Sequence, residues 1–157
     1  MPLAKGTNSY VTVAEADAYF ADRLDVAAWT DVVETEKSKA LVTATSILDT
    51  LEWRGSVTDI SQALAFPRDV DYFDPKMGRA LSFSGTTPDR IVKATYELAY
   101  HLLNNDGLLD NTSSVIEVRA GPIVLNKIKA PPTMPEIVIA LIAPLRNPGG
   151  SLWWRAN

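Results

Sequence analysis

The sequence contains no cysteine and one histidine, His101. The absence of cysteine excludes disulfides and thiolate metal sites. A Gly-x-Ser-x-Gly motif and a glycine-rich phosphate loop are also missing, which removes two common signatures of hydrolases and nucleotide-binding enzymes. These absences predict a protein that is not an enzyme, with no catalytic residue, cofactor or metal.

Two features, a histidine and an acidic segment, are compatible with an alternative function as a small hydrolase or a metal-dependent enzyme. His101 would serve as a general base or a metal ligand, but it has no second histidine beside it, and a histidine on a helix surface or interface is the simpler interpretation. The segment 69–74 alternates carboxylates as calcium loops do. It lacks the glycine and the glutamate that complete such a loop, so a solvated acidic loop is favoured.

Long apolar runs are scarce as well. The longest, from Ile137 to Leu145, contains Pro144 and falls short of the roughly 20 residues that span a bilayer, so no membrane partner is expected. The 15 basic residues are scattered and are outnumbered by 19 acidic ones, giving a net charge of −4. Since duplex-DNA binders concentrate positive charge, this composition argues against that class.

Apolar residues recur at helical spacing in three stretches. We expect helices over about 13–23, from 31 or 35 to 51, and from 87 to 104, with a further short helix ending near 143. Strands are expected over 115–119 and 123–127. The predicted fold is mainly α: a small bundle of three to four helices with a long crossover loop over 56–86, a β-hairpin near 115–128 and an extended C-terminal arm. Residues 1–145 would form one domain, and residues 146–157 a flexible arm.

The crossover loop carries apolar side chains where loops are normally polar. In the sequence QALAFPR, at positions 62–68, Pro67 fixes its own φ and favours an extended conformation for Phe66. A stiff, aromatic segment without catalytic residues indicates an interaction surface. The loop residues predicted to form an interface are Phe66, Arg68, Tyr72 and Phe73.

Two adjacent tryptophans follow a Gly-Gly pair near the C-terminus. Tryptophan and arginine dominate interface hot spots, so we interpret this arm as a docking segment rather than a tail that folds back on its own domain. The residues predicted to dock are Leu152, Trp153, Trp154 and Arg155.

Three aromatic side chains, Trp29, Trp53 and Phe66, would offer stacking platforms for single-stranded DNA. They lie near the ends of predicted helices without interleaved lysine or arginine. Core packing is therefore the favoured interpretation for the two tryptophans.

Several motifs follow one another in a specific order. They are YVTVAEADAYF at 10–20, Trp29, EK at 36–37, ALVTAT at 40–45, WRG at 53–55, QALAFPR at 62–68, and Pro88 followed by ATYELA at 94–99. This order resembles that of the head–tail connector proteins of tailed bacteriophages, also called adaptor or head-completion proteins. Some members of the group are labelled DnaT-like single-stranded-DNA-binding proteins. The likeness spans about 10–103 and continues only in outline from residue 115.

The resemblance implies a structural virion protein without an active site. It would form a homo-oligomeric ring, commonly a dodecamer, between the portal protein and the tail proteins, with the C-terminal arm docked on the portal. Genomic DNA would pass through the lumen without specific binding, and acidic subunits would keep phosphates from sticking. The expected location is the head–tail interface of the virion, and the host cytoplasm during assembly. The alternative is a DnaT-like replication protein that binds single-stranded DNA.

Overall fold

A computed structural model describes residues 2–105, 117–120, 123–126 and 134–147. This part of the chain contains five helices and five strands. The fold is therefore mixed α/β, and the expectation of a mainly α protein holds only in part. None of the described helices is long and apolar enough to cross a membrane.

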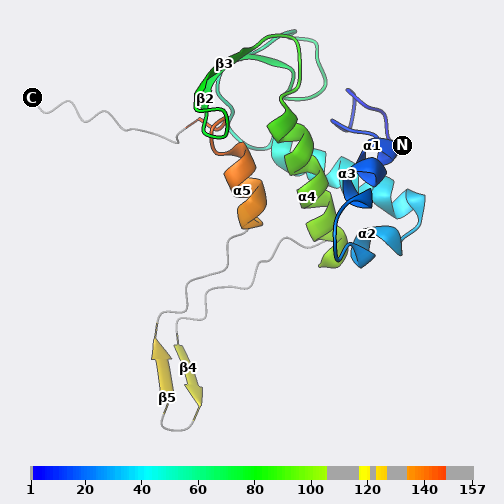
Figure 1. The fold of residues 1–157 in the computed structure, drawn as a ribbon, viewed down its shortest axis with the longest axis vertical. Helices are drawn as coiled ribbons and strands as arrows, with labels where there is room; N and C mark the ends of the chain where they lie inside the picture. The colour runs from blue at the N-terminus through cyan, green and yellow to red at the C-terminus, as the bar shows by residue number, and fades with distance from the viewer. Residues whose placement is uncertain (1, 106–116, 121–122, 127–133, 148–157) are drawn as a thin grey trace, which may run out of the picture.

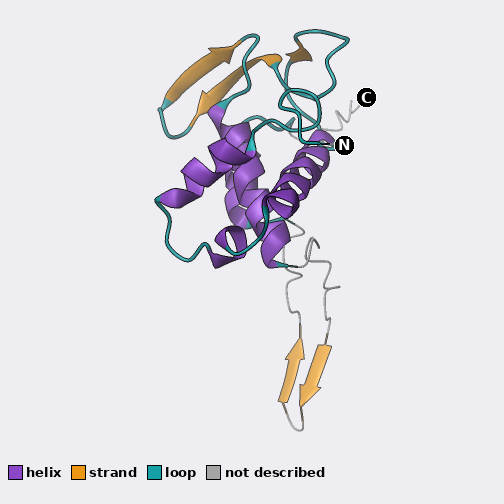
Figure 2. Ribbon diagram, turned by 90° about the vertical axis from the view of Figure 1, so that its right-hand side faces the viewer, coloured by secondary structure: helices purple, strands orange, loops and turns teal. Residues whose placement is uncertain are grey.

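The elements follow the chain in a simple order. The helices are α1 (Val13–Ala21), α2 (Ala27–Thr30), α3 (Glu34–Asp49), α4 (Asp89–Asn104) and α5 (Glu136–Ile142). The strands are β1 (Ser56–Val57), β2 (Arg68–Asp74), β3 (Arg79–Phe83), β4 (Glu117–Ala120) and β5 (Ile123–Asn126). The helices form the body of the molecule, and the sheet made by β1, β2 and β3 lies at their upper end (Figures 1 and 2).

The three long predicted helices are confirmed. At the start of α1 the Thr12 hydroxyl accepts from the backbone N–H of Glu15 at 3.2 Å, and the Glu15 carboxylate accepts from the backbone N–H of Thr12 at 2.8 Å. This reciprocal capping fixes where the helix begins. α4 begins at Asp89 rather than at residue 87, with Pro88 as its N-cap residue and no side chain capping it. The pattern does not predict α2, which is a single turn without a side-chain cap.

α4 is the centre of the core. It packs against α3 and α5 and also contacts α2. At its contact with α1, the buried Glu97 carboxylate accepts from the Tyr19 hydroxyl at 2.6 Å and from Arg23 at 2.5 Å. Burial, together with the bond to Glu97, raises the pKa of Tyr19 to about 12. The buried residues of α4 are Ile91, Ala94, Thr95, Tyr96, Glu97, Leu98, Ala99 and Leu102.

The segment between α3 and α4 is a three-stranded antiparallel sheet in the order β1-β2-β3, so the expectation of a long crossover loop is wrong. β2 pairs with β3 from Val70 opposite Phe83 to Asp74 opposite Arg79. The turn between them, DPKMG at 74–78, ends in Gly78 with φ +65°. Proline and glycine at these positions favour a tight turn, and such a turn permits the hairpin. The acidic residues of this segment mask the hairpin pattern in the sequence.

Side chains of β2 alternate between two faces, as a half-buried strand requires. Val70, Tyr72 and Asp74 are buried, whereas Asp69, Asp71 and Phe73 are exposed. The carboxylates that suggest a metal loop in the sequence therefore point to opposite faces. Strand pairing organises this segment.

β4 and β5 form the predicted hairpin, from Glu117 opposite Asn126 to Ala120 opposite Ile123. It is a two-stranded sheet of its own, and in both ribbon views it stands apart from the helices (Figures 1 and 2). At the other end of the described chain, the backbone N–H of Asn147 donates to the carbonyl of Glu52 at 3.1 Å. Residues 146 and 147, assigned to the arm from the sequence, are thus bonded to the segment that follows α3.

Candidate functional site

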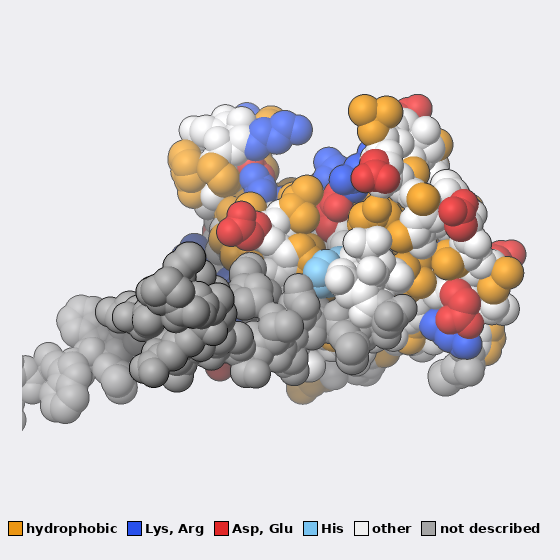
Figure 3. Space-filling model, turned by 90° about the horizontal axis from the view of Figure 1, so that it is seen from below, with side chains coloured by type: hydrophobic (Ala, Val, Ile, Leu, Met, Phe, Trp, Pro, Cys, Tyr) orange, Lys and Arg blue, Asp and Glu red, His pale blue; other side chains and the backbone are white. Residues whose placement is uncertain are grey.

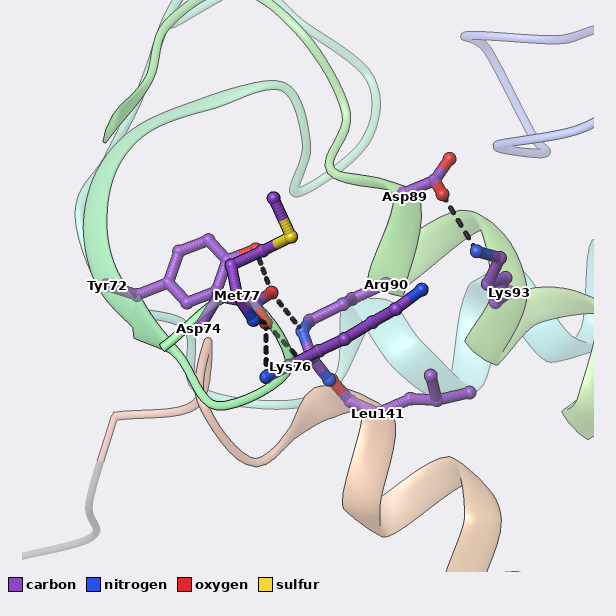
Figure 4. A network of polar contacts seen from close by, with 8 residues as sticks. All are labelled: Tyr72, Asp74, Lys76, Met77, Asp89, Arg90, Lys93 and Leu141. Carbon is purple, nitrogen blue, oxygen red and sulfur yellow. Dashed lines mark hydrogen bonds and ion pairs between the residues drawn. The ribbon is translucent and has the colours of Figure 1, made fainter. Parts of the chain in front are cut away.

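The end of β2 meets the first turn of α4 at an ion pair between Asp74 and Arg90. Arg90 Nε donates to one carboxylate oxygen of Asp74 at 2.8 Å, and Arg90 Nη2 donates to the other at 2.9 Å. The two side chains are only 8% and 14% exposed. Arg90 Nη1 also reaches the carbonyl of Leu141 at 3.5 Å. One guanidinium therefore joins β2, α4 and α5 (Figure 4).

Asp74 also organises the turn that follows it. Its Oδ1 accepts from the backbone N–H groups of Lys76 at 2.8 Å and Met77 at 3.1 Å, and its Oδ2 accepts from the Tyr72 hydroxyl at 3.2 Å. The hydrogen bonds from Arg90 and from these backbone amides hold the pKa of the Asp74 carboxyl well below its usual range. Asp74 is therefore an ionised structural carboxylate at neutral pH.

A hollow of about 350 Å³ opens beside this ion pair, between the β2–β3 hairpin, α4 and α5. Its apolar lining includes the half-buried ring of Phe83, which stacks on Tyr72 with centroids 5.7 Å apart and planes inclined by 19°. The apolar residues that line it are Tyr72, Met77, Leu81, Phe83 and Leu141. Such a lining suits a flat or apolar group of a ligand.

The hollow carries an excess of positive charge on a protein whose net charge is −4. Three cations line it, Lys76, Arg90 and Lys93, against two carboxylates, Asp74 and Asp89. Lys93 Nζ lies 2.9 Å from Asp89 in an exposed pair, which solvent weakens. Among the described residues, no carboxylate lies within 4.0 Å of Lys76 Nζ.

The view from below shows how charge is distributed over one face (Figure 3). Lysine and arginine side chains lie on both sides of an indentation in the upper half of that view, with acidic side chains close beside them, and further acidic side chains lie on the right-hand side. The surface in this view is therefore of mixed charge, with several basic groups gathered at the indentation.

A larger hollow, of about 460 Å³, lies between the N-terminal segment and α3. Its charged residues are Glu34 and Lys39, which offset one another, and no aromatic side chain lines it. The smaller hollow combines cations, an aromatic ring and a rigid ion pair, so it is the stronger candidate site.

The predicted interface residues separate into two groups. Phe66 and Tyr72 are 2% and 4% exposed, so their rings belong to the core of the chain. Arg68 is half-buried and Phe73 is 60% exposed, on the outer face of β2. An interface role stays a prediction for these two residues, and the predicted docking arm, Leu152 to Arg155, lies outside the described residues.

The structure also shows the surroundings of the two tryptophans and the histidine that the sequence singled out. Trp29 and Trp53 are 1% and 7% exposed, which agrees with core packing rather than base stacking. His101 Nδ1 lies 3.1 Å from Asn105 Nδ2. The residues that the structure describes hold no group of three or more histidine, aspartate or glutamate side chains placed to bind a metal ion.

Of the residues that line the hollow, the sequence predicted an interface role only for Tyr72, and it gave no such role to Arg90, Lys76 or Phe83. A signal was present in the alternation of apolar residues on both sides of the Pro75 to Gly78 turn, which is the pattern of a hairpin. The partnership of Arg90 with Asp74 had no local signal, because it is made in the tertiary structure.

Comparison with known families places the chain. The sequence model of a family described as "Putative DnaT-like ssDNA binding protein" matches residues 3–152. Comparisons with curated proteins and with solved structures gave no match. The matched region covers nearly the whole chain and includes every residue of the hollow. The chain therefore belongs to this DnaT-like family.

Proposed function

We propose that this protein binds single-stranded DNA without catalysing a reaction, and that the hollow beside Asp74 and Arg90 receives the strand. The observation that carries the proposal is the match to the DnaT-like family over residues 3–152. The composition of the hollow supports the same function on independent grounds.

Single-stranded DNA presents two chemistries, a negative backbone and flat bases, and its binding proteins meet them with cations and aromatic rings. Lys76 and Lys93 would pair with phosphates at the rim of the hollow. Phe83 would offer one ring face to a base, since its other face stacks on Tyr72. Arg90 is occupied by Asp74, so its role is to hold the hairpin against α4 and keep the lining in place.

The test is the salt dependence of binding to a labelled oligothymidylate of about 30 nucleotides, measured by fluorescence anisotropy between about 50 and 200 mM salt. The double variant Lys76→Gln/Lys93→Gln should reduce the slope of log K against log salt by about 1.4, since each lost single-strand phosphate contact removes about 0.7. Lys39→Gln is the matched control, because it removes one exposed lysine from α3, away from the hollow.

Two results would overturn the proposal. One is no binding of the wild-type protein at the lowest salt. The other is an equal loss of slope per lysine in the control and in the hollow variants, which would assign the binding to general charge rather than to this site.

A second candidate function is the ring adaptor between the portal and the tail of a phage. The observation that favours it is the β4–β5 hairpin, which pairs with no other described strand. An isolated two-stranded hairpin is marginally stable in water, so pairing with another subunit of a ring would complete it. The side chains of Ile60 and Leu24, 97% and 95% exposed, would also gain from burial against another subunit.

Mass photometry of the purified protein, followed by electron microscopy with the portal protein of the same genome, tests the adaptor function. A ring stacked on the portal is the expected result for an adaptor. A persistent monomer that does not bind the portal would exclude it. Deletion of residues 151–157 should leave the domain folded but weaken docking to the portal. Loss of the cooperative melt in the truncated protein would instead assign these residues to the core.

A further inference from the structure

Three arginines from distant parts of the sequence lie together at the start of β2. The backbone N–H of Arg54 donates to the carbonyl of Leu145 at 3.0 Å, and Arg54 Nε donates to the carbonyl of Arg146 at 3.0 Å. Arg68 Nε donates in turn to the carbonyl of Arg54 at 2.9 Å. The arginine cluster, Arg54, Arg68 and Arg146, thus gathers the residues after α3, at the start of β2 and after α5.

The three side chains differ in how many of their guanidinium N–H groups form hydrogen bonds. Arg68 donates to the carbonyls of Arg54, Ala65 and Gly55, so it fastens the backbone. Arg54 uses only its Nε among the described residues, and the exposed Arg146 guanidinium donates to none of them. The paired terminal N–H groups of Arg54 and Arg146 therefore have the geometry that favours bidentate binding of phosphate.

The charge of the cluster is not neutralised locally. Within the described part of the chain, no carboxylate comes within 4.0 Å of any of the three guanidinium groups. Two acidic residues are near in the chain, Glu52 and Asp69, and the Asp69 carboxylate accepts from the Ser84 hydroxyl at 2.6 Å. An anion bound by these guanidinium groups would offset their positive charge.

The cluster and the hollow lie at the two ends of the same strand. Arg68 begins β2 and Asp74 ends it, and six steps of about 3.3 Å separate them by roughly 20 Å. The face of β2 that they share is buried at Val70 and Tyr72, so a bound strand would pass from one site to the other over the surface of the molecule. α5 also connects the two, because Leu141 lines the hollow and Arg146 follows shortly after the helix. The outer face of β2 is closed to a phosphate backbone by Asp69 and Asp71.

We propose that the arginine cluster is a second phosphate site, which holds the same single strand that enters the hollow. The inference rests on the proposed binding of single-stranded DNA. Since stacked nucleotides advance about 3.4 Å each, a stacked strand needs about six nucleotides or more to span roughly 20 Å. Strands too short to bridge them occupy one site alone, so affinity rises in a step as the strand lengthens.

The test is a series of oligothymidylates from about 2 to about 12 nucleotides, measured with wild type, Arg146→Gln, Arg146→Lys and the control Lys39→Gln. Arg146→Gln should weaken binding of the longest strand about fivefold at low salt and abolish the step, while short strands bind as to wild type. Arg146→Lys keeps the charge but loses the paired donors, so it should restore only part of the affinity. The Arg146 guanidinium makes no described hydrogen bond, so a thermal melt should show an intact fold.

The outcomes separate the two proposals. Failure of the wild type to bind any strand contradicts the proposed function itself. Wild-type binding with an unchanged step in Arg146→Gln overturns the second site alone, and so does an equal loss at every length. A polyglutamate peptide that competes as well as the oligonucleotide also overturns it, because the cluster would then be a docking place for an acidic protein segment.

Discussion

Arg90, in the first turn of α4, holds the carboxylate of Asp74 at the end of β2 through two hydrogen bonds of 2.8 and 2.9 Å. This contact ties the end of the β2–β3 hairpin to α4. Because Asp74 also caps the turn between the strands, one carboxylate links the turn of the hairpin to the helix beside the hollow.

Replacement of Arg90 by methionine should lower the free energy of unfolding by about 2 kcal/mol, because it leaves a poorly solvated carboxylate without its cation. The measurement is urea unfolding at neutral pH. Lys93→Met is the matched control, since it removes a cation from the exposed pair with Asp89 and should cost less than about 1 kcal/mol. Equal losses in the two variants would contradict the structural role of Arg90.

Stability should fall with acid partly through Asp74. Its pKa is depressed in the folded protein, first by the bonds from Arg90, whereas an aspartate in the unfolded chain titrates near 4. Below about pH 4 the Asp74 carboxyl is therefore protonated in the unfolded chain while it stays ionised in the folded protein, and stability falls as the pH is lowered. In Asp74→Asn, the urea midpoint should depend less steeply on pH between about 4 and 2.5 than in wild type.

Asp49 provides the opposite case. Burial raises the pKa of its carboxyl, so its contribution favours the folded state as pH falls through that raised value. In Asp49→Asn, the free energy of unfolding should therefore fall more steeply with decreasing pH than in wild type. The same direction of change in both variants would contradict these assignments.

Gly55 and Gly78 both have positive φ, of +74° and +65°, yet we expect very different costs on replacement by alanine. A Cβ at Gly55 would lie 2.0 Å from the carbonyl oxygen of Asp69, whereas at Gly78 it would meet open space. Gly78→Ala should cost about 1 kcal/mol from its backbone conformation alone. Gly55→Ala should cost more than about 3 kcal/mol, because β1 and β2 must separate. Equal urea midpoints for the two variants would contradict the close approach at Gly55.

Phe83→Leu should weaken binding of single-stranded DNA by about tenfold, because stacking of one base is worth about 1–3 kcal/mol. The salt slope should stay unchanged, since no phosphate contact is lost. Phe73→Leu is the matched control from the outer face of the same hairpin, where Phe73 is 60% exposed. Equal effects of the two variants would show that the hollow does not hold a base.

The sequence predicts the helices well, because their apolar residues recur with the helical period. The capping box from Thr12 to Glu15 even marks the first residue of α1. The prediction of a long loop over 56–86 is wrong, because three aspartates around Val70 and Tyr72 mask the alternation of a strand. Leu81 and Phe83 repeat this alternation in the next strand.

The residues of the site could not be predicted from the sequence, for a different reason. Asp74 is acidic and precedes the turn Pro75 to Gly78, so its own neighbourhood predicts a solvated side chain. It is buried because Arg90 reaches it across the turn between sheet and helix. The arginine cluster likewise depends on the backbone bonds that bring residue 146 to residue 54, a contact across 92 positions that no local pattern encodes.

The pairing of Trp53 with Arg146 determines where mechanical load enters the molecule. Beside it, Arg54 donates to the carbonyl of Leu145, and Asn147 donates to the carbonyl of Glu52. A pull on the chain beyond Asn147 would therefore be borne by this clasp and passed to α3 and the sheet, before α5 felt any tension.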